Sequence, residues 1–190
     1  MIDYKTFKKG YLTEWVDRSQ AARKAAEELA NKEVKTSLRD KYTYEVQNPD
    51  LVFTLDGHKV EFKSENEVKS DGDSYFTYDE AMKCFGEPDL KDGWRLPTKE
   101  EYQALIDGYP YIFDKNSRQG IFGKHLYLPA MGYRDSGGCL RNSKSNGYYW
   151  SSTPDKSDSA WFLFFYSVET YTYVYYRYFG QSVRLVRDVK

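Results

Sequence analysis

The feature that most constrains the fold of this chain is a dense aromatic stretch near its C-terminus, from Trp161 to Arg177. Its first part is the run WFLFFY, and its second part alternates tyrosine with threonine and valine. Such alternation is typical of a β-strand, in which successive side chains point to opposite faces. The predicted strand places Tyr171, Tyr173, Tyr175 and Arg177 on one face and Thr172, Val174 and Tyr176 on the other.

Tyrosine in this pattern fits two roles. It is a strong strand former, and aromatic side chains paired across neighbouring strands stabilise a sheet. It is also common on binding surfaces, because its ring offers a large rigid face and a polar tip at a small cost in conformational entropy. A role in folding alone does not account for the crowding of tyrosines between Tyr166 and Tyr178. The pattern itself leaves both roles open.

The size and charge of the chain narrow the classes of function. Its 190 residues suffice for one domain with an extension, and its formal net charge is -1. Because there is no long run of lysine or arginine, a nucleic-acid partner has no electrostatic support. No apolar run approaches the roughly 20 residues needed to cross a bilayer, so we expect no membrane insertion.

The N-terminus and the two cysteines say less about the location and the folding of the protein. Residues Met1–Lys5 lack the apolar core of a secretory signal peptide. We therefore expect the protein to be cytoplasmic when it is made, with association with a virion or release by lysis as routes out of the cell. Cys84 and Cys139 are too few to form a disulfide framework. Buried free thiols are expected, with a single bridge as the alternative.

Residues 1–50 are predicted to form an N-terminal helical extension, and residues 51–190 a second domain. The segment after Thr13 is rich in alanine, which favours helix. A hydrophobic residue recurs every seven positions, at Trp15, Ala22 and Leu29. The helix either packs on its own domain or serves attachment and homo-oligomerisation.

The start of the second domain carries clear turn and helix signals. Asp56-Gly57 separates the apolar stretches Leu51–Leu55 and His58–Phe62, which predicts a hairpin with a tight turn. Thr77 and Thr98 are each followed three residues later by glutamate, the pattern of a capping box at the start of a helix. Short strands are expected further on, at residues 120–123, 125–130 and 147–153.

Several motifs in the second domain resemble those of a known family. The motif GWRLPT (Gly93–Thr98) is similar to the major paralogous domain of Fibrobacter and Bacteroides proteins. The further motifs, in the same order, are LPAMGYR (Leu128–Arg134), GYYWSS (Gly147–Ser152) and SVRLV (Ser182–Val186). The resemblance covers about residues 75–188. It implies an α+β, C-type lectin-like fold of the variant shared with formylglycine-generating enzymes, with two helices packed on a small twisted, mostly antiparallel sheet.

Within that family, many C-termini resemble the variable proteins of diversity-generating retroelements, and so does this one. In such proteins adenine-directed mutagenesis rewrites selected codons, so that a fixed scaffold carries a hypervariable face. The resemblance implies a phage or Bacteroides-type origin and candidate variable segments at residues 135–145, 155–159 and 164–178. The implied framework positions are Tyr133, Tyr149, Trp150, Ser151, Ser152, Val183 and Leu185.

Signatures of catalytic sites are missing from the sequence. Formylglycine-generating enzymes use cysteines near the C-terminus, whereas only Cys139 lies in the C-terminal half here. His58 and His125 are the only histidines, and neither stands in a metal-spacing motif. We therefore predict that the protein is not an enzyme and uses no metal and no cofactor. Arg184 and Arg187 are predicted to be structural ion-pair partners.

The sequence and the resemblance together predict a ligand-binding protein whose tyrosine-rich face contacts a protein or a glycan. The predicted contact residues are Arg134, Asp135, Tyr166, Tyr171, Tyr173, Tyr175, Tyr176, Arg177 and Tyr178. Alanine at Tyr173 and Tyr175 is expected to abolish binding while the melting temperature hardly changes. The alternative is a structural or assembly protein, such as a phage tail or fibre component, that uses the same surface for subunit contacts.

Overall fold

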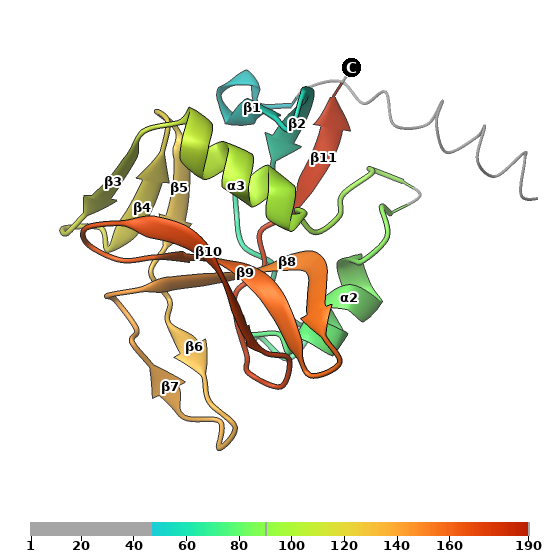
Figure 1. Ribbon diagram of the computed structural model, residues 1–190, viewed down its shortest axis with the longest axis vertical. Helices are drawn as coiled ribbons and strands as arrows, with labels where there is room; N and C mark the ends of the chain where they lie inside the picture. Colours follow the sequence, from blue (N-terminus) through green and yellow to red (C-terminus); the bar gives the residue numbers. More distant parts are fainter. Residues whose placement is uncertain (1–46, 90, 190) are drawn as a thin grey trace, which may run out of the picture. The chain divides into compact units, whose positions relative to one another are not determined.

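The computed structural model describes residues 47–89 and 91–189, and strands dominate them (Figure 1). The predicted N-terminal helix, with its proposed role in oligomerisation, lies outside the described residues. In the described part of the chain, no helix is long and apolar enough to span a membrane.

The strands of the described residues form four small antiparallel sheets. The first has the order β1-β2-β11 and contains Val52–Leu55, His58–Phe62 and Val186–Val189. The second has the order β3-β4-β5 and contains Tyr111–Asp114, Gln119–Phe122 and Leu126–Pro129. The third has the order β10-β9-β8, with β8 at Gly147–Lys156, β9 at Ser159–Phe165 and β10 at Thr170–Tyr176. The fourth pairs β6 (Tyr133–Arg134) with β7 (Leu140–Arg141).

The predicted α+β architecture, a C-type lectin-like fold with two helices packed on one small sheet, is wrong. The described residues are mostly β, and their strands are divided among four sheets. One cause is visible in the pairing. Most strands outside the third sheet are four residues or shorter and are closed by nearby turns, so they pair locally. The exception is β11, which pairs with β2 and places Val186 opposite Phe62, far away in the sequence.

The hairpin predicted around Asp56-Gly57 is confirmed. Leu55 lies opposite His58, which leaves Asp56 and Gly57 as a two-residue turn. Both turn residues have positive φ, +47° and +79°, as a type I′ turn requires. Glycine carries no Cβ and therefore adopts this conformation without strain.

Both predicted capping boxes are confirmed. A short 3-10 helix, η1 (Pro49–Leu51), precedes β1, and the α-helices are α2 (Tyr78–Phe85) and α3 (Lys99–Gly108). Thr77 accepts a hydrogen bond from the Glu80 amide while the Glu80 carboxylate accepts one from the Thr77 amide. Thr98 and Glu101 make the same pair of bonds at the start of α3.

Two hydrophobic cores lie on opposite faces of the β8–β10 sheet, because alternate side chains of each strand point to opposite sides. One core combines β8 and β9 residues such as Tyr149 and Phe165 with Tyr102 of α3. The other combines Trp150 and Phe162 with residues of α2. Figure 1 shows α3 running above this sheet, while the β6–β7 hairpin extends away from it.

Buried charged residues join the C-terminal segment to the first sheet. Arg187 donates to the Glu61 carboxylate at 2.7 Å, and both residues are buried, so its predicted role in an ion pair is confirmed. Arg184 differs: it donates to the Asn66 side chain and to the carbonyls of Lys63, Ser64 and Tyr127. No carboxylate among the described residues accepts a hydrogen bond from it, and burial lowers its pKa.

Both cysteine thiols, Cys84 and Cys139, are free and exposed. The predicted burial of these thiols is therefore wrong, and they do not form a bridge. Cys84 lies near the end of α2 and Cys139 in the turn between β6 and β7, where their side chains face solvent.

Candidate functional site

The third sheet has one face covered with rings, which we call the aromatic face. Its residues are Tyr148, Trp150, Phe162, Phe164, Tyr171, Tyr173 and Tyr175. In a first row across the strands, Tyr148 lies opposite Phe164, which lies opposite Tyr171. Neighbouring ring centroids in this row are 5.0 Å apart, within the range of favourable aromatic contacts. Tyr148 is 7% exposed and Tyr171 40%.

A second row of rings runs parallel to the first, and its side chains also become more exposed from β8 to β10. It aligns Trp150, Phe162 and Tyr173, whose side chains are 0%, 2% and 58% exposed. Each row therefore begins in the core at β8 and ends in solvent at β10. The exposed outer rings of Tyr171 and Tyr173 therefore contact inner rings that are packed in the core.

An aromatic turn, Tyr176–Phe179, continues the aromatic face beyond the end of β10. The rings of Tyr176 and Tyr178 are stacked with centroids 5.4 Å apart, and they are 47% and 53% exposed. Phe179 stacks on Tyr175 at 4.4 Å and so ties the turn to the aromatic face.

The exposed tyrosines have hydroxyls available to a partner. No hydrogen bond between described residues uses the hydroxyls of Tyr171, Tyr173, Tyr176 or Tyr178. Burial, together with the nearby charge of Glu169, raises the pKa of Tyr171. Its hydroxyl is therefore protonated at neutral pH and can both donate and accept.

Two further predicted tyrosines are engaged within the protein. Tyr175 is half-buried, contacts Phe179, and donates a hydrogen bond to the Tyr133 hydroxyl at 3.4 Å. Its pKa is raised by burial. Tyr166 is also half-buried, and its hydroxyl donates to the Glu169 carboxylate.

The charged residues among the predicted contact residues form hydrogen bonds and ion pairs within the chain. The Asp135 carboxylate accepts from the amides of Gly137 and Cys139 and from the Arg141 guanidinium. The Arg141 bond and these amides hold the pKa of Asp135 below its usual value. Asp135 therefore shapes the turn between β6 and β7.

The two arginines among the predicted contact residues, Arg134 and Arg177, are also bonded to groups within the chain. Arg134 donates to the Gly138 carbonyl and lies over the Tyr75 ring. Arg177 donates to the Ser157 carbonyl and to the Asp79 carboxylate, and lies over the Tyr78 ring. Of the nine predicted contact residues, Tyr171, Tyr173, Tyr176 and Tyr178 are the most exposed.

Segments distant in the sequence meet around the aromatic face. From the β6–β7 hairpin, Asn142 donates to the Tyr148 hydroxyl at 2.8 Å. From the turn between β8 and β9, the Ser157 carbonyl accepts from Arg177. The fold therefore places Asn142 beside Tyr148 of the aromatic face and Ser157 beside Arg177 at the end of the aromatic stretch.

Two hollows in the described part of the chain lie away from this surface. One of about 400 Å³ is lined by residues such as Phe76 and Cys84, and one of about 440 Å³ by residues such as Phe53 and Tyr109. Neither is lined by a residue of the aromatic face or the aromatic turn.

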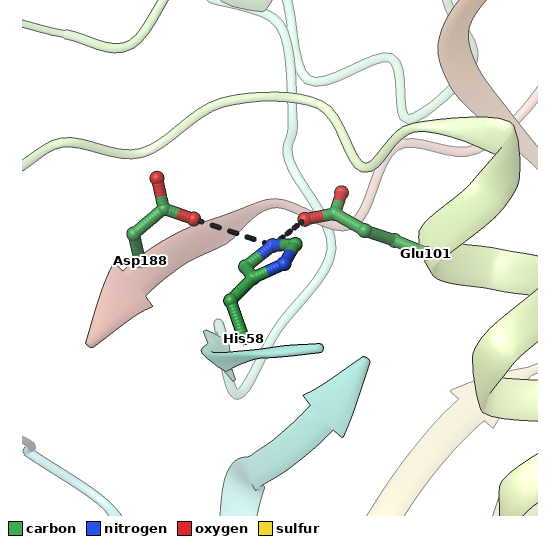
Figure 2. Close-up of side chains that lie close together, drawn as sticks. All are labelled: His58, Glu101 and Asp188. Atoms are coloured by element: carbon green, nitrogen blue, oxygen red, sulfur yellow. Dashed lines mark hydrogen bonds and ion pairs between the residues drawn. The ribbon is translucent and has the colours of Figure 1, made fainter. Parts of the chain in front are cut away.

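A second cluster, shown in Figure 2, joins three elements that the sequence did not connect. His58 of β2 points between Glu101 of α3 and Asp188 of β11. Its Nε2 lies 3.0 Å from Glu101 Oε1 and 3.8 Å from Asp188 Oδ1. One imidazole and two carboxylates at such distances could hold a metal ion.

Arg95 gives the better account of this cluster. Its Nη2 lies 2.7 Å from both Glu101 Oε1 and Asp188 Oδ1, so the guanidinium already supplies positive charge between the carboxylates. Burial alone would raise the pKa of Glu101, but the Arg95 bonds and charge outweigh it and lower the pKa. We therefore interpret the cluster as an ion-pair network that fastens α3 to the first sheet.

The network predicts a pH-dependent stability through His58. Desolvation would lower its pKa, but the hydrogen bonds to Glu101 and Asp56 and the nearby carboxylates outweigh it and raise the pKa above 6.5. A raised folded-state pKa stabilises the protein fully below the unfolded value, and this contribution is lost as pH rises through the folded value. The side chain is 43% exposed, so screening keeps the effect below about 1 kcal/mol.

The measurement is the difference in unfolding free energy between the wild type and His58→Gln. Urea titrations from about pH 5.5 to about pH 8 follow it through the relevant titration. The wild-type advantage is expected to shrink as pH rises. A difference that stays constant or grows would contradict the assigned role of His58.

Sequence reasoning missed the supporting part of the site. The run WFLFFY contains Phe162 and Phe164 at alternate positions, which could have been paired with the tyrosines of the next strand. Phe179 and Tyr148 had no such signal. The network around His58 had none either, because its members come from separate elements.

The comparisons with known proteins cover the same region. A family described as a domain of unknown function (DUF8237) matches residues 109–186, from the end of α3 to the first residue of β11, and so includes the whole aromatic face. No curated protein and no solved structure matches the chain significantly.

Proposed function

We propose that this protein is a non-catalytic ligand-binding protein that docks a protein or a glycan on its aromatic face and aromatic turn. The observation that carries the proposal is the pair of ring rows, packed at β8 and exposed at Tyr171 and Tyr173. Exposed tyrosines on a rigid base combine a large apolar area with adaptable hydroxyls. Such aromatics often dominate the energy of an interface.

We further propose that the protein is a variable protein of a diversity-generating retroelement, of phage or Bacteroides-type origin, and that it acts on a virion or after release. Support comes from the resemblance and from the placement of residues. Framework positions such as Tyr149, Trp150 and Val183 are fully buried, whereas the loop at 136–145 is exposed almost throughout. The test is the neighbouring DNA: we expect a reverse transcriptase gene and a near-copy of the final coding segment that differs mainly at adenines.

The binding prediction concerns a double variant, Tyr171→Ala with Tyr173→Ala. Binding is expected to weaken at least about 100-fold, because hot-spot aromatics each contribute roughly 2 kcal/mol or more. The melting temperature should hardly change, since these rings are 40% and 58% exposed. Tyr175 is left intact because its packing on Phe179 would confound binding with stability.

The measurement applies the labelled full chain to a glycan microarray and to immobilised surface proteins of candidate host bacteria. The matched control is Tyr127→Ala, because Tyr127 is 43% exposed but lies on β5, outside the aromatic face. Signals retained by the double variant, or lost equally in the control, would contradict the proposal.

A further inference from the structure

The outer edge of β10 has backbone groups that no other strand of the described residues uses. β10 is the end strand of its sheet, and its seven residues pair with β9 in one unbroken register. Bonds at both ends, from the Tyr166 amide to Glu169 and from the Arg177 amide to Asp158, set the alternation of the ladder. Tyr171, Tyr173 and Tyr175 therefore bond to β9, while the backbones of Thr172 and Val174 face away from it.

The β10 strand itself carries no charge, proline or bulge that would protect this edge against pairing. Natural edge strands carry charges, prolines or bulges, or are very short. The strand TYTYVYY has no charge and no proline, and its pairing with β9 has no bulge. Among the described residues, only the Tyr176 carbonyl, which accepts from the Phe179 amide, is used by another backbone group.

We propose that two copies of the chain pair through this edge, with their β10 strands antiparallel and Tyr173 on the two-fold axis. This register overlaps the whole of both strands. It places Thr172 opposite Val174 of the second copy, so that the outward-facing amides and carbonyls of both copies bond to each other. The two sheets then form one continuous sheet.

Side chains and charges also match in this register. Tyr173 faces Tyr173 of the second copy, and Tyr171 faces Tyr175, at the non-hydrogen-bonded positions where side chains approach most closely. The residues that flank the strand, Glu169 and Arg177, fall opposite each other across the axis with opposite charge. Within each copy, Glu169 also accepts from the Tyr166 hydroxyl and Arg177 donates to Asp79. The register that overlaps both strands fully is thus also the one that pairs these charges, and it joins the two aromatic faces into one surface.

The test is amide exchange measured by NMR on the full chain at about 5 µM and about 500 µM, which bracket the affinity of a small transient interface. We expect the amides of Thr172 and Val174 to become protected at the higher concentration. The amide of Tyr173 should be protected at both, because it bonds to β9. Sedimentation should show a monomer giving way to a dimer over the same range.

Two variants make the test specific. Val174→Pro removes an outward amide without touching the β9 ladder, a position where proline is tolerated, and should weaken dimerisation at least about tenfold because both copies lose a bond. Its control, Val174→Thr, keeps the amide and should dimerise like the wild type. Glu169→Lys places like charges across the axis and should weaken the dimer more at low salt than at high salt.

Two outcomes would overturn the proposal: fast exchange of Thr172 and Val174 at both concentrations, or a dimer that persists in a folded Val174→Pro variant. Either would leave the proposed function standing, provided that the ligand signals survive in Val174→Pro. If the ligand-binding signals are lost only in the double variant Tyr171→Ala with Tyr173→Ala, the result concerns the proposed ligand site and not the pairing of β10 strands.

Discussion

Replacing Glu61 with alanine is expected to lower the free energy of unfolding by roughly 3–5 kcal/mol, because a buried, hydrogen-bonded ion pair loses its carboxylate. The two side chains are each 3% exposed. Arg187 donates to Glu61 Oε2, while Glu61 Oε1 accepts from the amides of Gln47 and Asn48 at 3.2 and 3.0 Å. One carboxylate therefore holds together β2, β11 and the segment that enters the first sheet.

Urea unfolding followed by circular dichroism measures this loss. The charge effect is separated from packing by Glu61→Gln, which keeps the shape and an acceptor and should cost less than alanine. A double variant, Glu61→Leu with Arg187→Met, removes both charges and should recover much of the stability. A loss below about 1 kcal/mol in Glu61→Ala would show that the pair contributes no more than an exposed ion pair does.

Replacing Trp150 with alanine is expected to cost roughly 3–5 kcal/mol, the range for a large aromatic residue removed from a core. Its side chain is fully buried, and its indole N–H donates to the Phe76 carbonyl at 2.8 Å. Its ring makes edge contacts with Tyr78 and Phe162, with centroids 5.6 and 6.1 Å apart. The lost volume lies at the buried end of the second row of the aromatic face.

The same unfolding assay measures this variant, and Trp150→Phe is its control. Phenylalanine keeps a ring and loses the N–H, and the Phe76 carbonyl still accepts from the Gln181 amide, so a smaller loss is expected. Equal losses in the two variants would mean that the hydrogen bond, rather than the packed volume, dominates the contribution of Trp150.

Local signals in the sequence predicted local structure well. Asp56-Gly57 specified a two-residue turn because few other residue pairs adopt positive φ at both positions. Thr77 and Thr98 specified helix starts because their partners lie only three residues away. Alternation along residues 171–176 predicted which tyrosines share a face, because the side-chain period of a strand is two.

Pairings between strands that lie far apart in the chain could not be predicted from the sequence. Nothing in the strands themselves indicates that β11 pairs with β2, or that β3 to β5 form a separate sheet, because short strands present interchangeable backbone groups and similar apolar side chains. The roles of Asp135, Arg134 and Arg177 also depended on which groups the fold places beside them. Their charges suggested binding, and their contacts within the chain hold turns and loops.

By itself, the sequence determined the turn at Asp56-Gly57, the starts of both helices and the strand that carries the tyrosines, since each depends on residues a few positions apart. The tertiary structure alone decided the division into four sheets, the network around Arg95 and the exposure of each ring. Exposure depends on what packs above a side chain: the rows place Tyr148 and Trp150 in the core and leave Tyr171 and Tyr173 in solvent, although all four belong to strands that contain several aromatic residues.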